Sequence, residues 1–245
     1  MKTGLIVDLG MMEYGAAYEL QRRVVAARKA GVVPDVLLLC EHPHVITLGR
    51  NGKLANLRAS DHVLRQMGVT FFETDRGGDI TYHGPGQLVG YSILNLAEIR
   101  RDVAWYVRSL EEAMIRATAG FGISSRRVPD RTGVWVGVPG NPATEEEKLA
   151  AIGVHLSRWV TSHGFAYNVS TDLRYFDLIV PCGIADKCAT SLEKLLGRGV
   201  ELKEVSPRIA AHLGELFGIE FRAVGRDALD AQLREYEDQL VTSTA

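Results

Sequence analysis

The segment from Asp75 to Gln87, DRGGDITYHGPGQ, combines residue types that suit a ligand site. Glycine lets backbone N–H groups approach a ligand closely, and proline makes a turn rigid. The four glycines of this segment would weaken a plain strand. We therefore predict that the segment lines a binding site, with Arg76 and His83 among its polar groups. A pair of turns around a short strand is the alternative interpretation.

Cys182 is the candidate nucleophile of the chain. It stands between Pro181 and Gly183 on a turn that follows an apolar run, where a thiol can be exposed. An unassisted cysteine has a pKa of roughly 8.5, so a nucleophilic role needs a nearby base or cation. Lys148 precedes the apolar run 149–154, and burial would lower the pKa of its amine enough for a base. A surface lysine and a small core cysteine are the alternatives.

Composition restricts the class of protein. The chain has 245 residues, of which 46% are hydrophobic and 24% charged, with a formal net charge of -2. This profile is typical of one soluble globular domain, and it offers no general basic field for nucleic acid. The N-terminus lacks the features of a signal sequence, and no apolar run is long enough to span a membrane. We therefore expect that residues 1–245 form one domain, and that it interacts with neither nucleic acid nor membrane.

The three cysteines are Cys40, Cys182 and Cys188. They are too few and too unevenly spaced for a disulfide framework, which favours a reducing cytoplasm. Cys40 lies inside an apolar run, where we expect a core residue, and Cys188 is interpreted as structural or incidental.

Metal and nucleotide motifs are weak or missing. His42 and His44 flank a proline beside Cys40 and Glu41, but this spacing matches neither CxxC nor HExxH. A turn with one histidine facing the site is the preferred interpretation, and a zinc enzyme the weaker one; we predict no metal. The sequence contains no P-loop, no GxGxxG before a helix and no GxSxG elbow.

Hydrophobic periodicity predicts a sheet-rich centre followed by helices. Strands are expected at residues 5–9, 36–40, 45–48 (as a partner of 36–40), 70–74, 79–83, 88–94, 134–136, 149–156, 159–162 and 165–169. Helices are expected at residues 14–30, 103–121, 191–196, 205–216 and 228–240. Residues 137–147 are rich in turn formers and are expected to form a loop, and residues 196–245 are expected to form a helical C-terminal extension of the same domain.

Four ordered blocks resemble the octanoyltransferases, also called the lipoate-protein ligase B family. They are RGGDITYHGPGQ from Arg76, KLAAIGV from Lys148, HGFAYNV from His163 and VPCGI from Val180. The resemblance covers about residues 14–196. It implies an α/β (α+β) fold: a mixed β-sheet core flanked by helices, as in the catalytic domain of biotin and lipoate protein ligases.

The resemblance also implies a reaction. Octanoyl-acyl carrier protein would deliver a thioester, Cys182 would form an acyl-enzyme, and Lys148 would act as the base. The acceptors would be apo lipoyl domains of 2-oxoacid dehydrogenase complexes and the glycine cleavage H protein, with no cofactor. The residues implied to bind the substrate are Arg76, Gly77, Gly78, Asp79, Ile80, Thr81, Tyr82, His83, Ala151, Ile152, Gly153, Gly164, Phe165 and Ala166.

The sequence departs from the family pattern at two places, and other classes of function remain as alternatives. His155 occupies a position where an arginine or another basic residue is expected, and three glutamates immediately precede Lys148. If those carboxylates fold close to Lys148, they would raise the pKa of its amine. The alternatives are an ATP-dependent lipoate or biotin ligase, a non-catalytic acyl-binding or lipoate-binding module, and an amidotransferase between lipoyl-domain proteins.

Overall fold

The computed structural model describes residues 1–137, 146–180 and 189–243. They form an eight-stranded sheet in the order β11-β1-β2-β6-β10-β9-β8-β7 and a three-stranded sheet in the order β4-β3-β5. The strands are β1 (Lys2–Met11), β2 (Val36–Glu41), β3 (Val45–Leu48), β4 (Thr70–Glu73), β5 (Ile80–His83), β6 (Gln87–Ile93), β7 (Arg126–Val128), β8 (Arg131–Val136), β9 (Glu147–Ser157), β10 (Val160–Asn168) and β11 (Ile219–Ala223). The helices are α1 (Tyr14–Lys29), α2 (Asp61–Gln66), α3 (Leu96–Ile99), α4 (Val103–Ala119), α5 (Leu192–Leu196), α6 (Leu202–Phe217) and α7 (Arg226–Ser243), with 3-10 turns at Leu54–Asn56 and Leu173–Leu178.

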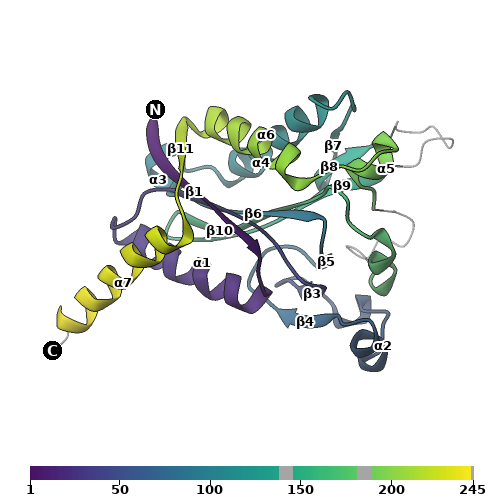
Figure 1. Ribbon diagram of the computed structural model, residues 1–245, viewed down its shortest axis with the longest axis horizontal. Helices are drawn as coiled ribbons and strands as arrows, with labels where there is room; N and C mark the ends of the chain where they lie inside the picture. Colours follow the sequence, from purple (N-terminus) through teal and green to yellow (C-terminus); the bar gives the residue numbers. More distant parts are fainter. Residues whose placement is uncertain (138–145, 181–188, 244–245) are drawn as a thin grey trace.

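Helices cover both faces of the large sheet (Figure 1). Leu37 and Leu39 of β2 pack into the core cluster of α4 and α6, whereas Val36, Leu38 and Cys40 pack into the cluster of α1 and α7. Successive side chains of a strand point to opposite faces, so a strand buried on both faces is apolar throughout. The expected mixed sheet flanked by helices is confirmed. None of the helices in the described ranges is long and apolar enough to cross a bilayer.

The small sheet lies beside the large one, next to α2 (Figure 1). Strand β3 pairs in parallel with β4 and antiparallel with β5. The expected pairing of residues 45–48 with 36–40 is therefore wrong. The two neighbours of β2 are β1 and β6, so neither of its edges is open to β3. The glycine-rich segment leads from β4 through β5 into β6, and so from the small sheet into the large one.

Two strand boundaries also differ from expectation. Residues 159–162 and 165–169 were expected as separate strands, but β10 is one strand, and it pairs with β9 without a register shift. His163, with φ 57°, and Gly164 lie inside the ladder. Positive φ usually marks a turn, but here both neighbouring strands hold the His163–Gly164 pair in the sheet.

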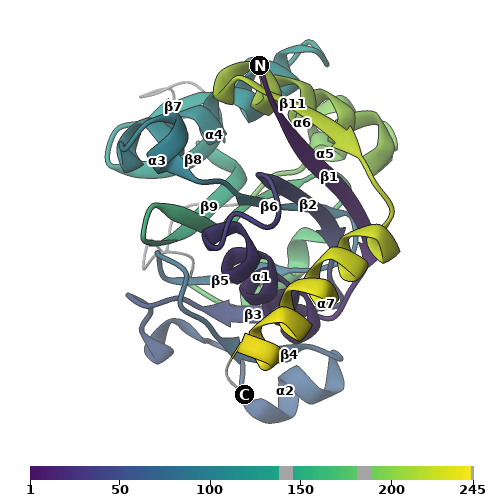
Figure 2. The same cartoon turned by 90° about the vertical axis from the view of Figure 1, so that its left-hand side faces the viewer.

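The sequence analysis predicts a helical C-terminal extension, but this part of the chain also contains a strand. Strand β11 forms an edge of the large sheet and pairs in parallel with β1. Its register joins Lys2 to Ile219, a separation that local periodicity does not report. The last helix, α7, lies beside α1 (Figure 2), where Arg23 Nε donates to Glu237 Oε1 at 2.6 Å.

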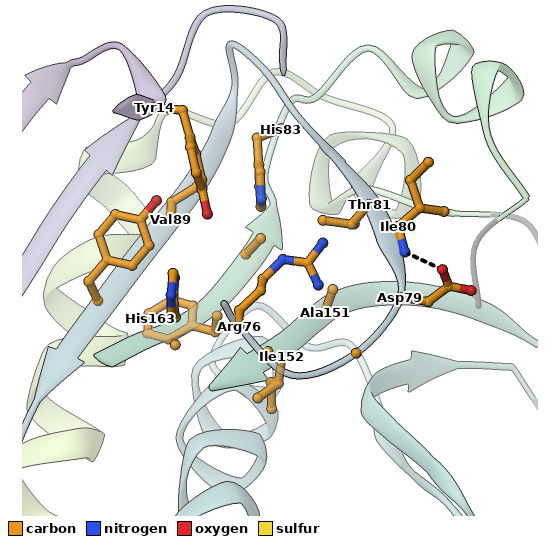
Figure 3. A pocket seen from close by; sticks show the side chains of 16 residues that line it. Tyr14, Arg76, Asp79, Ile80, Thr81, His83, Val89, Ala151, Ile152 and His163 are labelled. Atoms are coloured by element: carbon orange, nitrogen blue, oxygen red, sulfur yellow. Dashed lines mark hydrogen bonds between the residues drawn. The ribbon is translucent and has the colours of Figure 1, made fainter. Parts of the chain in front are cut away.

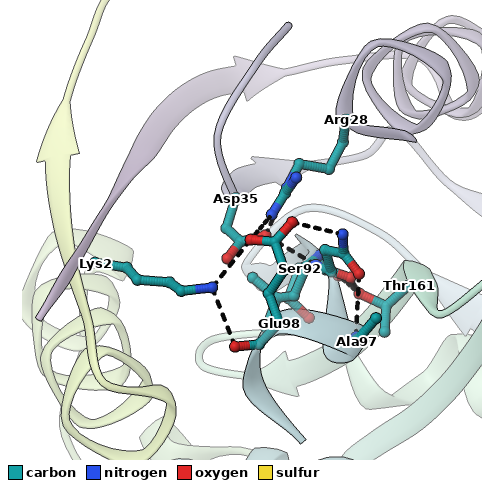
Figure 4. A network of polar contacts seen from close by, with 9 residues as sticks. Lys2, Arg28, Asp35, Ser92, Ala97, Glu98 and Thr161 are labelled. Carbon is teal, nitrogen blue, oxygen red and sulfur yellow. Dashed lines mark hydrogen bonds and ion pairs between the residues drawn. The ribbon is translucent and has the colours of Figure 1, made fainter. Parts of the chain in front are cut away.

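A polar network joins β1, α1 and α3 (Figure 4). Arg28 Nε donates to Asp35 Oδ1 at 2.8 Å, and Arg28 Nη2 donates to Glu98 Oε2 at 2.9 Å. Lys2 Nζ also donates to Glu98 Oε2, at 2.9 Å. Hydrogen bonds from Arg28 and Lys2 lower the pKa of Glu98 from 4.5 to about 2. A depressed folded-state pKa contributes stability above pH 4.5 that is lost as the pH falls toward 2.

Replacing Glu98 with glutamine should therefore lower the free energy of unfolding at pH 6 by less than about 1 kcal/mol, since the carboxylate is partly exposed. The difference from the wild type should shrink steadily between pH 4.5 and pH 2, because glutamine does not titrate. Urea unfolding over this pH range measures it. A difference that stays constant with pH would contradict the assignment of the Glu98 charge to this network.

Candidate active site

A pocket lies between the large sheet and the glycine-rich segment. Strands β6, β9 and β10 form its floor, and residues 76–83 cover it. Figure 3 shows Tyr14 and His163 at one end, and Thr81 and Ala151 toward the other. The lining residues are Tyr14, Arg76, Gly78, Asp79, Ile80, Thr81, His83, Val89, Tyr91, Ala151, Ile152, Gly153, His163, Gly164, Phe165 and Ala166.

Most positions implied by the resemblance are brought together here, except Gly77 and Tyr82. Gly77 lies against β9, where its N–H donates to Val154 O at 2.9 Å. Tyr82 points to the other face of the small sheet; its hydroxyl is 2.7 Å from His44 Nδ1 and its ring stacks on Tyr175. Tyr82 is therefore corrected from a lining residue to a core residue of the small sheet. Alternation along β5 accounts for this, since Thr81 and His83 occupy the opposite face.

Glycines allow the covering segment to approach the sheet. A Cβ at Gly153 would lie 2.7 Å from Gly77 O of the covering segment, and one at Gly164 would lie 2.2 Å from Gly90 O of the neighbouring strand β6. Both contacts are with backbone, which cannot rotate away. Gly153 therefore lets the main chain of the covering segment lie directly on β9, at the floor of the pocket.

Replacing Gly153 with alanine should destabilise the protein by about 1–3 kcal/mol, because the new methyl group overpacks a backbone contact. Urea unfolding measures the effect. Gly199→Ala is the matched control, since a Cβ there meets no atom within 4 Å. Equal stability of the two variants would contradict the close approach of Gly77 to β9.

Arg76 ties the covering segment to the small sheet. Its Nη2 donates to Thr47 O at 2.7 Å and to Thr47 Oγ1 at 2.8 Å, and its Nη1 donates to Gly77 O at 3.1 Å. The side chain is buried, and it extends into the space between His83 and Ala151 (Figure 3). A buried guanidinium with several acceptors is rigid, so it supplies a fixed positive charge to the pocket.

Two histidines beside the pocket are held neutral. Burial lowers the pKa of His83 to about 3 and that of His42 to about 4. His42 Nδ1 donates to Met12 O at 2.6 Å, so Nε2 accepts from the Tyr91 hydroxyl at 2.7 Å. Both ring nitrogens of His42 are thereby engaged. In the described part of the chain, no group of three or more acidic, histidine or cysteine side chains is placed to hold a metal ion.

His163 was not identified from the sequence as a lining residue, and neither were Tyr14, Val89 and Tyr91. His163 Nε2 donates to Asp75 Oδ1 at 2.8 Å, and the Tyr18 hydroxyl donates to the same oxygen at 3.0 Å. The hydrogen bond from His163 is the main reason that the pKa of Asp75 lies well below its usual value. The alternation of strand 88–94 could have placed Val89 and Tyr91 on one face. His163 opens one of the four family blocks, but neither it nor Tyr14 was marked by the sequence as facing the pocket.

Lys148 stands near the beginning of β9, three residues before Ala151 of the pocket. Its Nζ lies 4.7 Å from the centroid of the Trp135 ring. Of the three preceding glutamates, Glu146 pairs with Arg126 and Arg131, and Glu147 accepts from Lys194 Nζ at 2.6 Å. These two carboxylates have cationic partners other than Lys148. The remaining one, Glu145, lies outside the described residues.

Cys182 lies outside the described residues, but both flanks of its segment are described. Before it, Val180 N–H donates to Asn56 O at 2.7 Å, and Asn56 Nδ2 donates to Asp79 Oδ2 at 2.5 Å. After it, Ala189 forms a bridge with Lys148, and Thr190 N–H donates to Lys148 O at 3.0 Å. One flank is thus linked to a pocket residue and the other to Lys148.

The pocket is mainly apolar and suits a ligand with an alkyl chain, and Lys148 lies three residues from its floor along β9 of a mixed α/β fold. The catalytic domain model of lipoyl protein ligases A/B matches residues 13–214. The chain therefore belongs to the lipoyl protein ligase A/B family.

Within this family the chain is similar to proteins named octanoyltransferase, which confirms the resemblance found in the sequence. The octanoyltransferase of Solibacter usitatus (strain Ellin6076) is 54% identical over 220 residues, covering 90% of this chain and 96% of that protein. The octanoyltransferase of Koribacter versatilis (strain Ellin345) is 51% identical over 215 residues, covering 86% of this chain and 83% of that protein. A bi-partite lipoate protein ligase of Thermoplasma acidophilum has the same fold, with a TM-score of 0.73 at 17% identity over 97% of this chain and 93% of that chain.

Proposed function

We propose that this enzyme moves an octanoyl group from octanoyl-acyl carrier protein, through a thioester on Cys182, to the ε-amine of a lysine on a lipoyl domain. The observation that carries the proposal is the junction at the Ala151 end of the pocket. There the backbone of Lys148 pairs with Ala189 and Thr190, which follow the Cys182 segment. Val180, which precedes that segment, is linked through Asn56 to Asp79 of the pocket lining. The relatives named octanoyltransferase support the choice of acyl group.

The first half-reaction is thiol exchange. The Cys182 thiolate attacks the thioester carbonyl of the donor, the new C–S bond forms, and the old C–S bond to the carrier thiolate breaks. The carrier thiolate then takes the proton that Cys182 has given up through Lys148. A cationic or basic neighbour is needed because a free thiol is mostly protonated at neutral pH.

The second half-reaction forms the amide. The acceptor lysine attacks the Cys182 thioester as a neutral amine, the C–N bond forms, and the Cys182 thiolate leaves. Lys148 takes the proton that the amine loses. A thioester is already activated and an amide is more stable, so no nucleotide is required.

The pocket supplies the acyl site. Its lining includes glycines, alanines, isoleucines and Phe165 beside polar groups such as Arg76 and His83. The apolar part suits an alkyl chain, since each buried CH₂ contributes roughly 0.8 kcal/mol. The proposed acceptors are lipoyl domains of 2-oxoacid dehydrogenase complexes and the glycine cleavage H protein, and the proposed compartment is the cytoplasm.

The proposal is tested by intact-mass measurement of the wild-type enzyme after incubation with octanoyl-acyl carrier protein, without ATP. The expected result is one octanoyl adduct that disappears when an apo lipoyl domain is added, while the domain gains the same mass. Peptide mapping should place the adduct on Cys182. An unmodified enzyme, together with lipoyl-domain modification that requires ATP and free acid, would instead identify a ligase.

A further inference from the structure

A second cavity lies behind the far end of the pocket. It opens between α1 and the β9–β10 hairpin, and its lining includes Tyr18, Gln21, Lys29, Asp75 and His155. It shares no lining residue with the pocket described above. The two cavities meet at His163, which lines the pocket and is hydrogen-bonded to Asp75 and Gln21 of the second cavity.

The Asp75–His163 pair forms a rigid partition between the pocket and the second cavity. The His163 side chain is only 3% exposed, and its Nε2 is 2.8 Å from Asp75 Oδ1. The Tyr18 ring stacks on the imidazole at a centroid distance of 5.6 Å and bonds through its hydroxyl to Asp75. The backbone N–H of His163 donates to Gln21 Oε1 at 2.9 Å. Helix α1 therefore holds both members of the pair in place.

The partition stands opposite the proposed reaction centre. Along β9, Lys148 comes first, Ala151 and Gly153 follow in the pocket floor, and Val154 pairs with His163 of β10. The stretch from Ala151 to Val154 spans roughly 10 Å at the rise of a strand. An acyl chain attached near Lys148 and lying along this floor therefore points its terminal methyl group at His163.

We propose that the Asp75–His163 pair sets the length of the acyl chain that the enzyme accepts, by closing the pocket at the position of the terminal methyl group. This assignment rests on the proposed function. It adds a specificity-determining residue, His163, at the end of the chain remote from the chemistry, and a positioning residue, Asp75, that holds it.

Both shape and polarity make the partition selective. His163 Nδ1 is buried and has no hydrogen-bond partner among the described residues. A further CH₂ would have to displace an imidazole fixed by Asp75, Tyr18 and Gln21, and would press alkyl surface onto polar atoms. One misfitting methylene in a shaped pocket changes reactivity by roughly 10-fold or more. Beyond His163, the second cavity offers space for a longer chain, although most of its lining side chains are polar, such as Gln21, Lys29 and His155.

The test is His163→Gly, which removes the imidazole and joins the two cavities. Glycine suits this position, because the φ of 57° at His163 is strained for most side chains. Asp130→Gly is the matched control, since Asp130 has φ 60° on an exposed turn away from both cavities. Acyl-enzyme formation is measured by intact mass with hexanoyl, octanoyl, decanoyl and dodecanoyl carrier proteins.

We expect His163→Gly to raise the ratio of decanoyl to octanoyl transfer by roughly 10-fold or more, and Asp130→Gly to keep the wild-type ratio. Asparagine also tolerates positive φ, so His163→Asn is the second test variant if the glycine variant does not fold. It should raise the ratio of decanoyl to octanoyl transfer by a smaller factor. A folded variant with the wild-type chain-length profile would overturn the partition. Failure of the wild type to take up any acyl group would instead refute the proposed function.

Discussion

Replacing Cys182 with alanine should remove the octanoyl adduct and reduce transfer to a lipoyl domain by at least about 10³-fold. The thiolate is the atom that the proposed route acylates, and alanine has no nucleophile to replace it. Substrate binding should persist, because the acyl pocket is made of other residues. Competition by unreactive octanoyl analogues should therefore be the same in the variant and in the wild type.

Cys40→Ala is the matched control for this prediction. Cys40 is 2% exposed in the core between β2 and α1, and burial raises the pKa of its thiol far above the ordinary value. Its thiol is therefore protonated and out of reach, and the variant should form the adduct like the wild type. An adduct that survives in Cys182→Ala but not in Cys40→Ala would place the nucleophile on β2 and contradict the proposal.

The parts of the site that are contiguous in sequence were predictable. The glycine-rich segment, residues 151–153 and residues 164–166 each lie in one block, so both composition and resemblance point to them. Tyr82 was assigned to the pocket with its block, although alternation along a short strand places it on the other face, against His44 and Tyr175. Blocks identify a segment, whereas the facing of each side chain depends on the pairing of its strand.

The parts formed by distant segments were not predictable. Tyr14 and His163 reach the pocket from α1 and β10, and the Asp75–His163 bond joins residues 88 positions apart. Strand β11 was missed for the same reason, since its pairing with β1 spans nearly the whole chain. Local periodicity reports burial but not partners, so contacts of this kind emerge only with the folded sheet.

Replacing Lys148 with methionine should slow octanoyl transfer by about 10²–10⁴-fold, the usual contribution of a positioned general base. Methionine keeps an unbranched apolar chain near the Trp135 ring, on which Lys148 Nζ lies at 4.7 Å, so the fold should survive. Lys194→Met is the matched control. It removes an exposed amine that pairs with Glu147, the residue beside Lys148, and it should leave the transfer rate unchanged.

Lys148→Arg separates the two roles that an amine can have here. A guanidinium keeps the positive charge that favours the Cys182 thiolate, but it cannot accept a proton at neutral pH. Alkylation of Cys182 by iodoacetamide at pH 7 should therefore stay fast in Lys148→Arg and become slow in Lys148→Met. Discharge of the acyl-enzyme to the lipoyl domain should be slow in both variants, because the acceptor amine loses its base. If Lys148→Arg discharges at the wild-type rate, Lys148 acts through its charge alone and another group takes the proton of the acceptor.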